Sequence, residues 1–323
     1  MAGSLACATL ARAQSPAKHF RIGYLGPSPE TAPKLVAAFK EGLAALGYED
    51  GRNITIDWRW TNAGTRMNDE PTLVASAREL AAKKPDVIVA SIDPAILAAR
   101  KGAGSIPIVM LNASDPVGLG FVASLAHPGG NVTGLTNQSA ELIGKKLQVL
   151  LEVVPNAKVV GLLVSGPSAI RDETVARTRA LASSRSIALL VAEATTVAAL
   201  DGAFAELKRG RTDALLIADT GGGVFFTERA RLVELASVHR LPTMFSNAEV
   251  VEAGGLMSYA PNSSDNYRRA ATYIDRILRG ARPGDLPVEQ PTKFDLTINA
   301  GTAKALGIAF TPAFLLRVDR TVP

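Results

Sequence analysis

The 323-residue sequence contains a single cysteine, Cys7, so it can form no disulfide bond within the chain and no cysteine-based metal site. Its three histidines, His19, His127 and His239, are too far apart to show the spacing of metal ligands. No apolar run reaches the roughly 18–20 residues that a membrane-spanning helix requires. Aromatic residues make up only 5% of the chain, so Ala, Val, Leu and Ile must supply most of the core. We therefore expect a globular protein that holds neither a metal nor a cofactor.

The sequence also lacks the short motifs of common enzymes. It has no G-x-S-x-G elbow, no phosphate-binding G-x-x-x-x-G-K-[ST] loop and no H-E-x-x-H pair. Gly102–Pro107 has proline where a dinucleotide fingerprint needs its third glycine, and it precedes a strand instead of following one. Gly221–Gly223 does follow a strand but is more typical of a flexible loop than of a phosphate cradle. We expect no catalytic residues.

Charge of one sign is only slightly in excess, with a net charge of +5 from 35 basic and 30 acidic residues. The densest basic runs, such as Lys83-Lys84 and Lys208–Arg211, are short and lie near expected helix ends, where cations favour the helix dipole. No helix-turn-helix precedes Phe20 to read DNA. The sequence therefore argues against a nucleic-acid partner.

Residues 1–19 differ from the rest of the chain and are interpreted as a residual signal peptide or tail. Residues 4–10 are weakly apolar, and Ala11-Arg12-Ala13 matches an A-x-A cleavage pattern. Ser4-Leu5-Ala6 is a poor match to the residues that precede a lipidated cysteine, so Cys7 is not favoured as an anchor. A disordered tail is the alternative. We expect an exported, periplasmic protein whose first thirteen residues are removed.

From Phe20 onward, short β-branched runs alternate with amphipathic stretches. Within residues 86–91, Val87-Ile88-Val89-Ala90 is a continuous apolar run, which is typical of a central parallel strand buried on both faces. Strands are predicted at residues 21–25, 53–60, 86–91, 107–111, 158–164, 187–192, 214–218, 242–245, 255–259 and 293–298. A turn cluster at His127–Gly130 divides the pattern into two arrays of similar length. The fold class is therefore α/β, with two doubly wound parallel-sheet domains.

Small polar and tyrosine residues occupy the loops that follow the expected strands. Ligands bind beyond the carboxyl ends of the strands in open α/β sheets, so these residues are candidate ligand contacts. They are Tyr24, Ser28, Ser91, Asp93, Asn112, Ser114, Asp115, Asn137, Ser165, Asp219, Ser246 and Tyr259. For any one of them, capping of the following helix is an equally good interpretation. Two such sets of loops facing each other would form a polar cleft suited to a small zwitterion or carboxylate.

Four stretches in this order resemble a known family. They are Gly42–Trp60 (GLAALGYEDGRNITIDWRW), Ile106–Gly134 (IPIVMLNASDPVGLGFVASLAHPGGNVTG), Gly254–Asn262 (GGLMSYAPN) and Leu286–Gly307 (LPVEQPTKFDLTINAGTAKALG). The sequence from Phe20 to Pro312 resembles the ABC-transporter substrate-binding family that includes tryptophan- and tyrosine-type binding proteins. The resemblance implies a type I periplasmic-binding-protein architecture with three interdomain crossovers.

The same resemblance implies boundaries and partners. One domain would hold residues 20–131 plus 254–285, and the other residues 132–253 plus 286–323. The expected partners are a small-molecule ligand, a membrane permease and its ATPase, with the chain itself a monomer. We expect the domains to close on ligand through hinges near Gly130–Gly134, Ala253–Gly255 and Gly284–Pro287.

We expect the chain to capture an amino acid, possibly an aromatic one, or a related small carboxylate, with no chemical step. A ligand-sensing regulatory module of the same fold is the alternative, and an α/β enzyme is a weaker one. We place the ligand carboxylate at Ser91 and at the backbone amides of Ala113–Asp115, with Asp115 as partner of an ammonium group. Selectivity would then fall to the second domain through Ser165, Asp219 and Ser246, and to Tyr24 and Tyr259.

Overall fold

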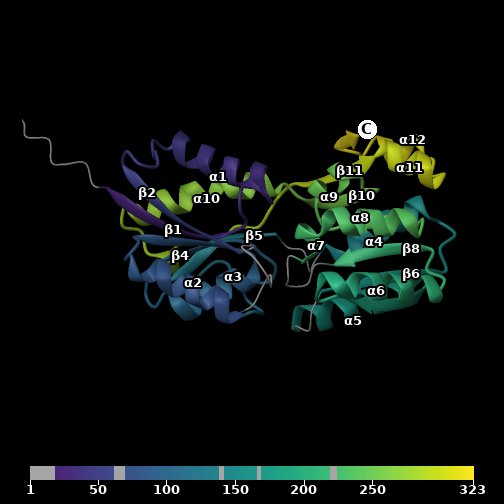
Figure 1. The fold of residues 1–323 in the computed structure, drawn as a ribbon, viewed down its shortest axis with the longest axis horizontal. Helices are drawn as coiled ribbons and strands as arrows, with labels where there is room; N and C mark the ends of the chain where they lie inside the picture. The colour runs from purple at the N-terminus through teal and green to yellow at the C-terminus, as the bar shows by residue number, and fades with distance from the viewer. Residues whose placement is uncertain (1–18, 62–69, 138–141, 166–168, 219–223) are drawn as a thin grey trace, which may run out of the picture.

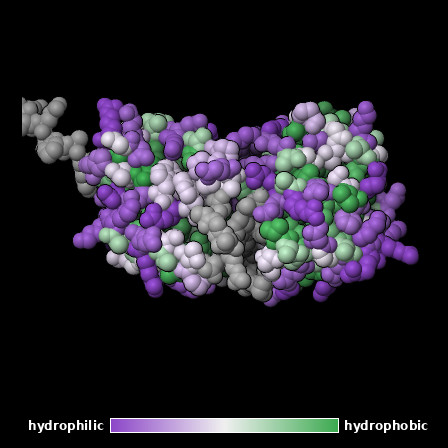
Figure 2. All heavy atoms as spheres, in the orientation of Figure 1, coloured by the Kyte–Doolittle hydropathy of each residue, from purple (hydrophilic) through white to green (hydrophobic). Residues whose placement is uncertain are grey.

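The computed structural model describes residues 19–61, 70–137, 142–165, 169–218 and 224–323. Two α/β lobes lie side by side, and each has a central sheet with helices on both faces (Figure 1). Hydrophilic residues cover much of the outer surface of both lobes (Figure 2). The buried apolar side chains gather in four clusters, two in each lobe, one on either face of its sheet.

The first sheet contains five parallel strands in the order β2-β1-β3-β4-β5. Its strands are β1 (Phe20–Gly26), β2 (Ile54–Trp60), β3 (Val87–Ser91), β4 (Ile108–Ala113) and β5 (Val132–Thr136). Every residue of β3 is buried, because strands pair with it on both sides and helices cover both of its faces. The continuous apolar run of this segment thus corresponds to the buried central strand that the sequence predicts.

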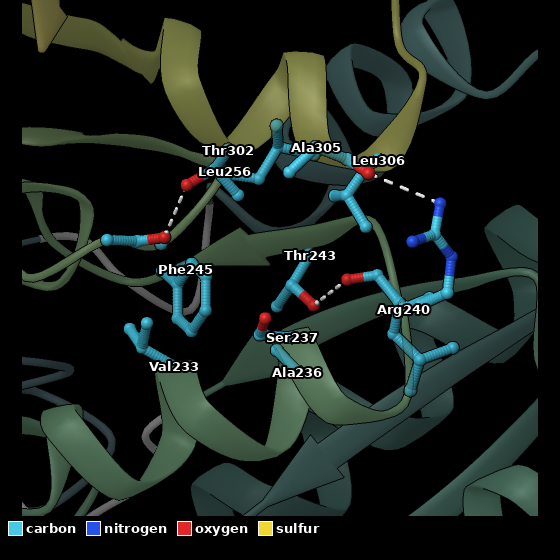
Figure 3. A pocket seen from close by; sticks show the side chains of 13 residues that line it. Val233, Ala236, Ser237, Arg240, Thr243, Phe245, Leu256, Thr302, Ala305 and Leu306 are labelled. Carbon is cyan, nitrogen blue, oxygen red and sulfur yellow. Dashed lines mark hydrogen bonds between the residues drawn. The ribbon is translucent and has the colours of Figure 1, made fainter. Parts of the chain in front are cut away.

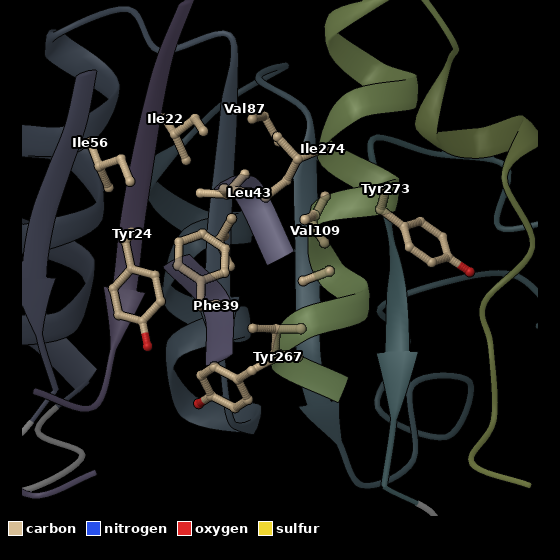
Figure 4. Close-up of a cluster of buried hydrophobic side chains, with 14 of the residues drawn as sticks. Ile22, Tyr24, Phe39, Leu43, Ile56, Val87, Val109, Tyr267, Tyr273 and Ile274 are labelled. Atoms are coloured by element: carbon tan, nitrogen blue, oxygen red, sulfur yellow. The ribbon is translucent and has the colours of Figure 1, made fainter. Parts of the chain in front are cut away.

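Helices α1 and α10 pack side by side on one face of the first sheet, and α2 and α3 cover the other (Figure 1). Their bounds are α1 (Pro33–Ala45), α2 (Glu70–Ala82), α3 (Asp93–Gly102) and α10 (Ser263–Leu278). The core below α1 and α10 includes Phe39, Tyr24 and Tyr267 (Figure 4). Trp58 and Trp60 stack on each other with ring centroids 5.1 Å apart and pack against this cluster.

The second sheet contains seven strands in the order β12-β11-β10-β9-β8-β6-β7. They are β6 (Val159–Val164), β7 (Ala188–Glu193), β8 (Ala214–Ala218), β9 (Thr243–Phe245), β10 (Met257–Pro261), β11 (Phe294–Asn299) and β12 (Arg320–Val322). β11 runs antiparallel to β10, which departs from the all-parallel sheet that the sequence predicts. The reason is that the chain returns from the first domain and begins β11 at Phe294, which lies beside Pro261, the last residue of β10.

The remaining helices belong to the second domain, apart from a 3₁₀ turn in the returning segment. They are α4 (Ile143–Val153), α5 (Ala169–Ser183), α6 (Val197–Arg209), α7 (Val224–Thr227), α8 (Arg229–Val238), α9 (Ala248–Glu252), α11 (Ala300–Leu306), α12 (Pro312–Leu315) and the turn η1 (Pro283–Asp285). Among the described residues, none of the helices is long and apolar enough to cross a membrane.

The chain passes between the lobes three times: after β5, between β10 and α10, and before β11. These crossing points correct the boundaries predicted at 131/132, 253/254 and 285/286. β5 pairs with β4 in the first sheet, and β10 pairs with β9 in the second. Residue 289 still bridges to Leu135 of the first domain. The boundaries that the family resemblance implies therefore lie one short segment before each crossing.

Candidate functional site

The carboxyl ends of the parallel strands in each lobe point toward the other lobe (Figure 1). In the first domain these ends lie at residues 26, 91 and 113, and in the second at residues 164, 218 and 245. Open α/β sheets bind ligands at this edge, so the two binding edges of the molecule face each other. The candidate site is the region between them.

The hydroxyl groups of Ser91, Tyr267 and Tyr24 form a buried cluster in the first domain, which we call its floor. The hydroxyls of Ser91, at the end of β3, and Tyr267, on α10, share a hydrogen bond, and Tyr24 bonds to Tyr267. Figure 4 shows Tyr24 and Tyr267 pointing their hydroxyls toward the same end of the sheet. Burial raises the pKa of Tyr267 to about 12 and that of Tyr24 well above its ordinary value. Both tyrosines are therefore neutral hydrogen-bonding groups.

Asn266, the neighbour of Tyr267, forms hydrogen bonds with the ends of two more strands, β4 and β5. Its side-chain amide donates to the side-chain oxygen of Asn112 at 2.9 Å and to the backbone carbonyl of Thr136 at 3.0 Å. Asn112 has a left-handed φ of 54°, and Asn137 donates to its carbonyl oxygen at 3.2 Å. The first turns of α10 thus hold the ends of β3, β4 and β5 together.

The loops after β3 and β4 are also joined directly. Asp93 accepts hydrogen bonds from the backbone amide of Ser114 at 3.0 Å and from its hydroxyl. Ile92, directly before Asp93 in the chain, has a φ of 70° and a ψ of 153°, which are strained for a β-branched residue. Such a conformation costs on the order of 1–3 kcal/mol, and strain of this kind clusters at ligand sites. The geometry therefore marks this edge as a functional one.

Other predicted residues of the first domain have structural partners. Asp115 accepts from the backbone amide of Gly118 at 2.8 Å, so it caps its own turn as the alternative interpretation holds. Ser28 is buried in the turn after β1, with its hydroxyl 3.4 Å from that of Thr31.

The predicted residues of the second domain lie at the facing edge or close to it. Ser165 is buried directly after β6, and Ser246 donates to the carbonyl oxygen of Ile217 at 2.9 Å. Tyr259 stacks on Phe294 with centroids 5.9 Å apart, on the side of β10 that faces the domain core. Asp219 lies outside the described residues.

Two contacts bridge the domains beside this region. Lys34 on α1 donates to both carboxylate oxygens of Glu252 on α9, at 2.8 and 2.7 Å. Arg320 of β12 holds the same carboxylate at 2.5 Å from within the second domain. Phe226 of α7 packs against the first domain's core cluster. The lobes therefore touch through an ion pair and an aromatic side chain.

Three residues at the facing edges were not predicted: Asn266, Tyr267 and Glu249. A signal existed for Asn266, because this polar residue lies on the apolar stripe of an amphipathic helix with Ala270 and Ile274. Glu249 carried no such signal, since glutamate in the first turn of a helix is common.

A cavity of about 140 Å³ lies elsewhere, between α8 and α11 in the second domain (Figure 3). Its polar groups are bonded internally: Arg240 donates to the carbonyl oxygen of Ala305 at 3.2 Å, and Thr302 donates to that of Gly254 at 2.7 Å. No group of three or more His, Cys, Asp or Glu able to hold a metal occurs among the residues that the structure describes. We assign this cavity to imperfect packing between the two helices.

Two α/β domains with three crossovers and facing binding edges define a two-domain solute-binding protein. The family model described as ABC transporter substrate binding protein matches residues 29–322, and the chain belongs to this family. It is thus the substrate-binding component of an ABC transporter. Members of the family bind small ligands outside the cytoplasmic membrane and deliver them to a permease and its ATPase. The family resemblance seen in the sequence is confirmed.

Individual proteins and solved structures are similar to this chain over most of its length. The chain is 28% identical over 280 residues to the tyrosine-binding protein of Clostridioides difficile strain R20291, covering 87% of this chain and 77% of that protein. A conserved domain protein from Vibrio cholerae matches with a TM-score of 0.85 and 26% identity over 94% of this chain and all of that one. A Streptococcus pneumoniae ABC domain in complex with L-Trp has the same fold, with a TM-score of 0.83 and 23% identity over 94% of this chain and all of that one.

Proposed function

We propose that the chain captures an amino acid or a related small carboxylate between its two domains and performs no chemistry on it. The observation that supports this proposal most is that the carboxyl ends of the strands in the two domains face each other. The ends of β3 and β4 in the first domain are held in place by the Ser91–Tyr267 and Asn112–Asn266 hydrogen bonds. A braced, strained edge keeps its donors in place before ligand arrives, which reduces the entropic cost of binding.

The ligand carboxylate is assigned to the ends of β3 and β4, near Ser91 and the backbone amides of Ala113–Asp115. Hydrogen bonds to Tyr267 and Asp93 fix the orientation of the hydroxyls of Ser91 and Ser114 in this part of the site. Asp115 accepts a hydrogen bond within its own turn, which weakens the prediction from the sequence that it pairs with an ammonium group of the ligand. Selectivity for the rest of the ligand is assigned to Ser165, Asp219, Ser246 and Tyr259 of the second domain.

The ligand class receives support from relatives that bind aromatic amino acids, the tyrosine-binding protein and the L-Trp complex. Export is supported by the family and by the cleavage pattern at Ala11–Ala13, and the docking partners are a permease and its ATPase. We also propose that the protein works as a monomer, with each copy carrying a whole cleft.

A thermal-shift screen tests this function. Purified protein is heated with single amino acids, small carboxylates and sugars, because a ligand that binds only the folded state stabilises it by RT ln(1 + [L]/Kd). We expect a rise in melting temperature with at least one amino acid or carboxylate, and recovery of that compound unchanged after incubation. Stabilisation by sugars alone, or conversion of the compound, would sink the proposal.

A further inference from the structure

Glu249 is the second residue of α9, which begins two residues after β9 ends. This short helix is fixed at both ends. Asn247 caps it by accepting from the backbone amide of Val250 at 3.3 Å, and the ion pair between Lys34 and Glu252 ties it to α1 of the first domain. Glu249 therefore occupies the facing edge of the second domain, beside a contact between the lobes.

The carboxylate of Glu249 is poor in partners. Among the described residues, no side chain forms a hydrogen bond or ion pair with it, and its own backbone amide is its one hydrogen-bond donor. The two cations that act on it are engaged elsewhere. Lys34 donates to Glu252, and Arg229 donates to the carbonyl oxygen of Phe226 at 3.0 Å with its guanidinium over the Phe226 ring. A carboxylate in this position lacks a counter-ion.

Its surroundings disfavour the ionised form. Burial is the main cause that raises the pKa of Glu249, and the neighbouring charge of Glu252 raises it further. The hydrogen bond from its own backbone amide and the charges of Lys34 and Arg229 lower the pKa without overcoming these effects. A desolvated carboxylate is costly unless a cation is placed against it. The ionised Glu249 carboxylate thus destabilises the unliganded protein, and a cationic group of the ligand would remove this unfavourable free energy.

Glu249 also lies within electrostatic reach of the first domain's floor. The pKa of Tyr267 is raised by burial first, and the negative charge of Glu249 raises it as well. Tyr267 is the residue that bonds to Ser91 at the end of β3. Glu249 of the second domain therefore lies close enough to Tyr267 of the first for the two groups to interact electrostatically.

We propose that Glu249 binds the ammonium group of the ligand, so that the transported solute is an amino acid and not a simple carboxylate. This inference rests on the proposed capture of a solute between the domains. The first domain would hold the carboxylate of the zwitterion, and Glu249 would hold its ammonium from the opposite side. Closure would then require both charges of the ligand, which gives selection for amino acids without contacts to their side chains.

The acids of the first domain are less suited to this role. Both carboxylate oxygens of Asp93 accept from Ser114, and Asp115 accepts from the amide of Gly118. Their negative charges are already compensated by fixed donors, so an ammonium group would gain less from either than from Glu249.

Calorimetry with paired probes tests the inference. The amino acids are L-tyrosine and L-tryptophan, and the matched compounds without an amine are 3-(4-hydroxyphenyl)propanoate and indole-3-propanoate. The full set of twenty L-amino acids serves if these two do not bind. The variant is Glu249→Gln, which keeps the shape and removes the charge. The control is Glu206→Gln on the outer helix α6, which makes the same change of net charge at an exposed position.

We expect wild-type protein to prefer the amino acid over its amine-free partner. Glu249→Gln should weaken amino-acid binding by at least about 30-fold, equivalent to about 2 kcal/mol, and leave the amine-free compound nearly unaffected. Glu206→Gln should behave as wild type.

Unchanged amino-acid affinity in Glu249→Gln would overturn the inference, as would equal binding of both compounds by the wild type. If the wild type binds carboxylates but none of the twenty amino acids, the inference falls and solute capture stands. If no solute of any class binds, both fall together.

Discussion

The hydroxyl groups of Ser91 and Tyr267 share a buried hydrogen bond although 176 residues separate them in the chain. Ser91 ends the central strand of the first sheet, whereas Tyr267 lies on the helix that the chain enters directly after crossing from the second domain. The bond therefore connects a binding edge to a crossover. Movement of α10 would therefore displace the end of β3, which faces the candidate site.

Tyr267→Phe should weaken both folding and binding. Removing the hydroxyl leaves the Ser91 and Tyr24 hydroxyls short of a partner in a buried place, which costs about 1–3 kcal/mol of unfolding free energy. Urea unfolding measures this loss, and calorimetry should show weaker ligand binding. The control is Tyr273→Phe on the same helix, whose hydroxyl donates to the carbonyl oxygen of Pro287 at 2.7 Å and points away from the site (Figure 4). Equal effects of both variants on affinity would argue against a link between the floor and the ligand.

Asn266→Ala should be more damaging to the site than its small change in volume suggests. Two acceptors, the half-buried side-chain oxygen of Asn112 and the buried carbonyl oxygen of Thr136, lose their donor, at an expected cost of about 2–4 kcal/mol. Hydrogen exchange should show faster opening at the ends of β4 and β5. A variant that unfolds at wild-type urea concentration, with unchanged exchange there, would refute this role.

The ion pair between Lys34 and Glu252 should influence how far the lobes open. Lys34 is 62% exposed, so the pair is worth at most about 1 kcal/mol, which still changes a two-state population about fivefold. Lys34→Met should therefore leave unfolding nearly unchanged and increase the radius of gyration of the unliganded protein in small-angle scattering. Arg320→Met removes a cation from the same carboxylate without crossing the domains and should not open the lobes. Identical scattering of Lys34→Met and wild type would speak against the bridge.

Acid should loosen the same bridge. Burial acts to raise the pKa of Glu252, but hydrogen bonds from Lys34 and Arg320 outweigh it and the pKa is lowered. A lowered carboxyl pKa means that its stabilising effect is fully present above the ordinary value of 4.5 and is lost as the pH falls through the lowered value. Scattering from pH 7 down to pH 3 should show the lobes separating below pH 4.5, and Glu252→Gln should remove this acid-dependent step.

Glu249 should affect stability with the opposite sign. Its pKa is raised in the folded protein, so ionisation disfavours folding as the pH rises from 4.5 through the raised value. Glu249→Gln should consequently raise the melting temperature of the unliganded protein at pH 7 and change it much less at pH 4, where the Glu249 carboxyl is mostly protonated. A variant that is less stable than wild type at pH 7 would show that Glu249 has a stabilising partner instead.

Much of the fold could be predicted from local patterns. The apolar run at residues 86–91 and the alternation at 53–60 correspond to β3 and β2, because period and burial are properties of neighbouring residues. The pairing of β5 and β10 could not be predicted in this way. Glycine-rich turns show where the chain bends, but which sheet accepts a strand depends on contacts distant in sequence.

The site was predictable only in part, for a similar reason. Polar residues after strands could be located because strand ends could be, so Ser91, Asn112 and Ser114 were identified as edge residues. Tyr267 and Asn266, the partners of Ser91 and Asn112, could not be identified, since they come from a helix more than 150 residues away. A capping role and a binding role also look alike in sequence, and the contact to Gly118 decides for Asp115.

The most direct test of the account is a calorimetric titration of unliganded wild-type protein with each of the twenty L-amino acids, followed by small carboxylates and sugars. The account predicts saturable binding of at least one amino acid at one molecule per chain, with the affinity weakened at least about 30-fold in Glu249→Gln and kept in Glu206→Gln. Binding of sugars and of no amino acid or carboxylate would contradict it.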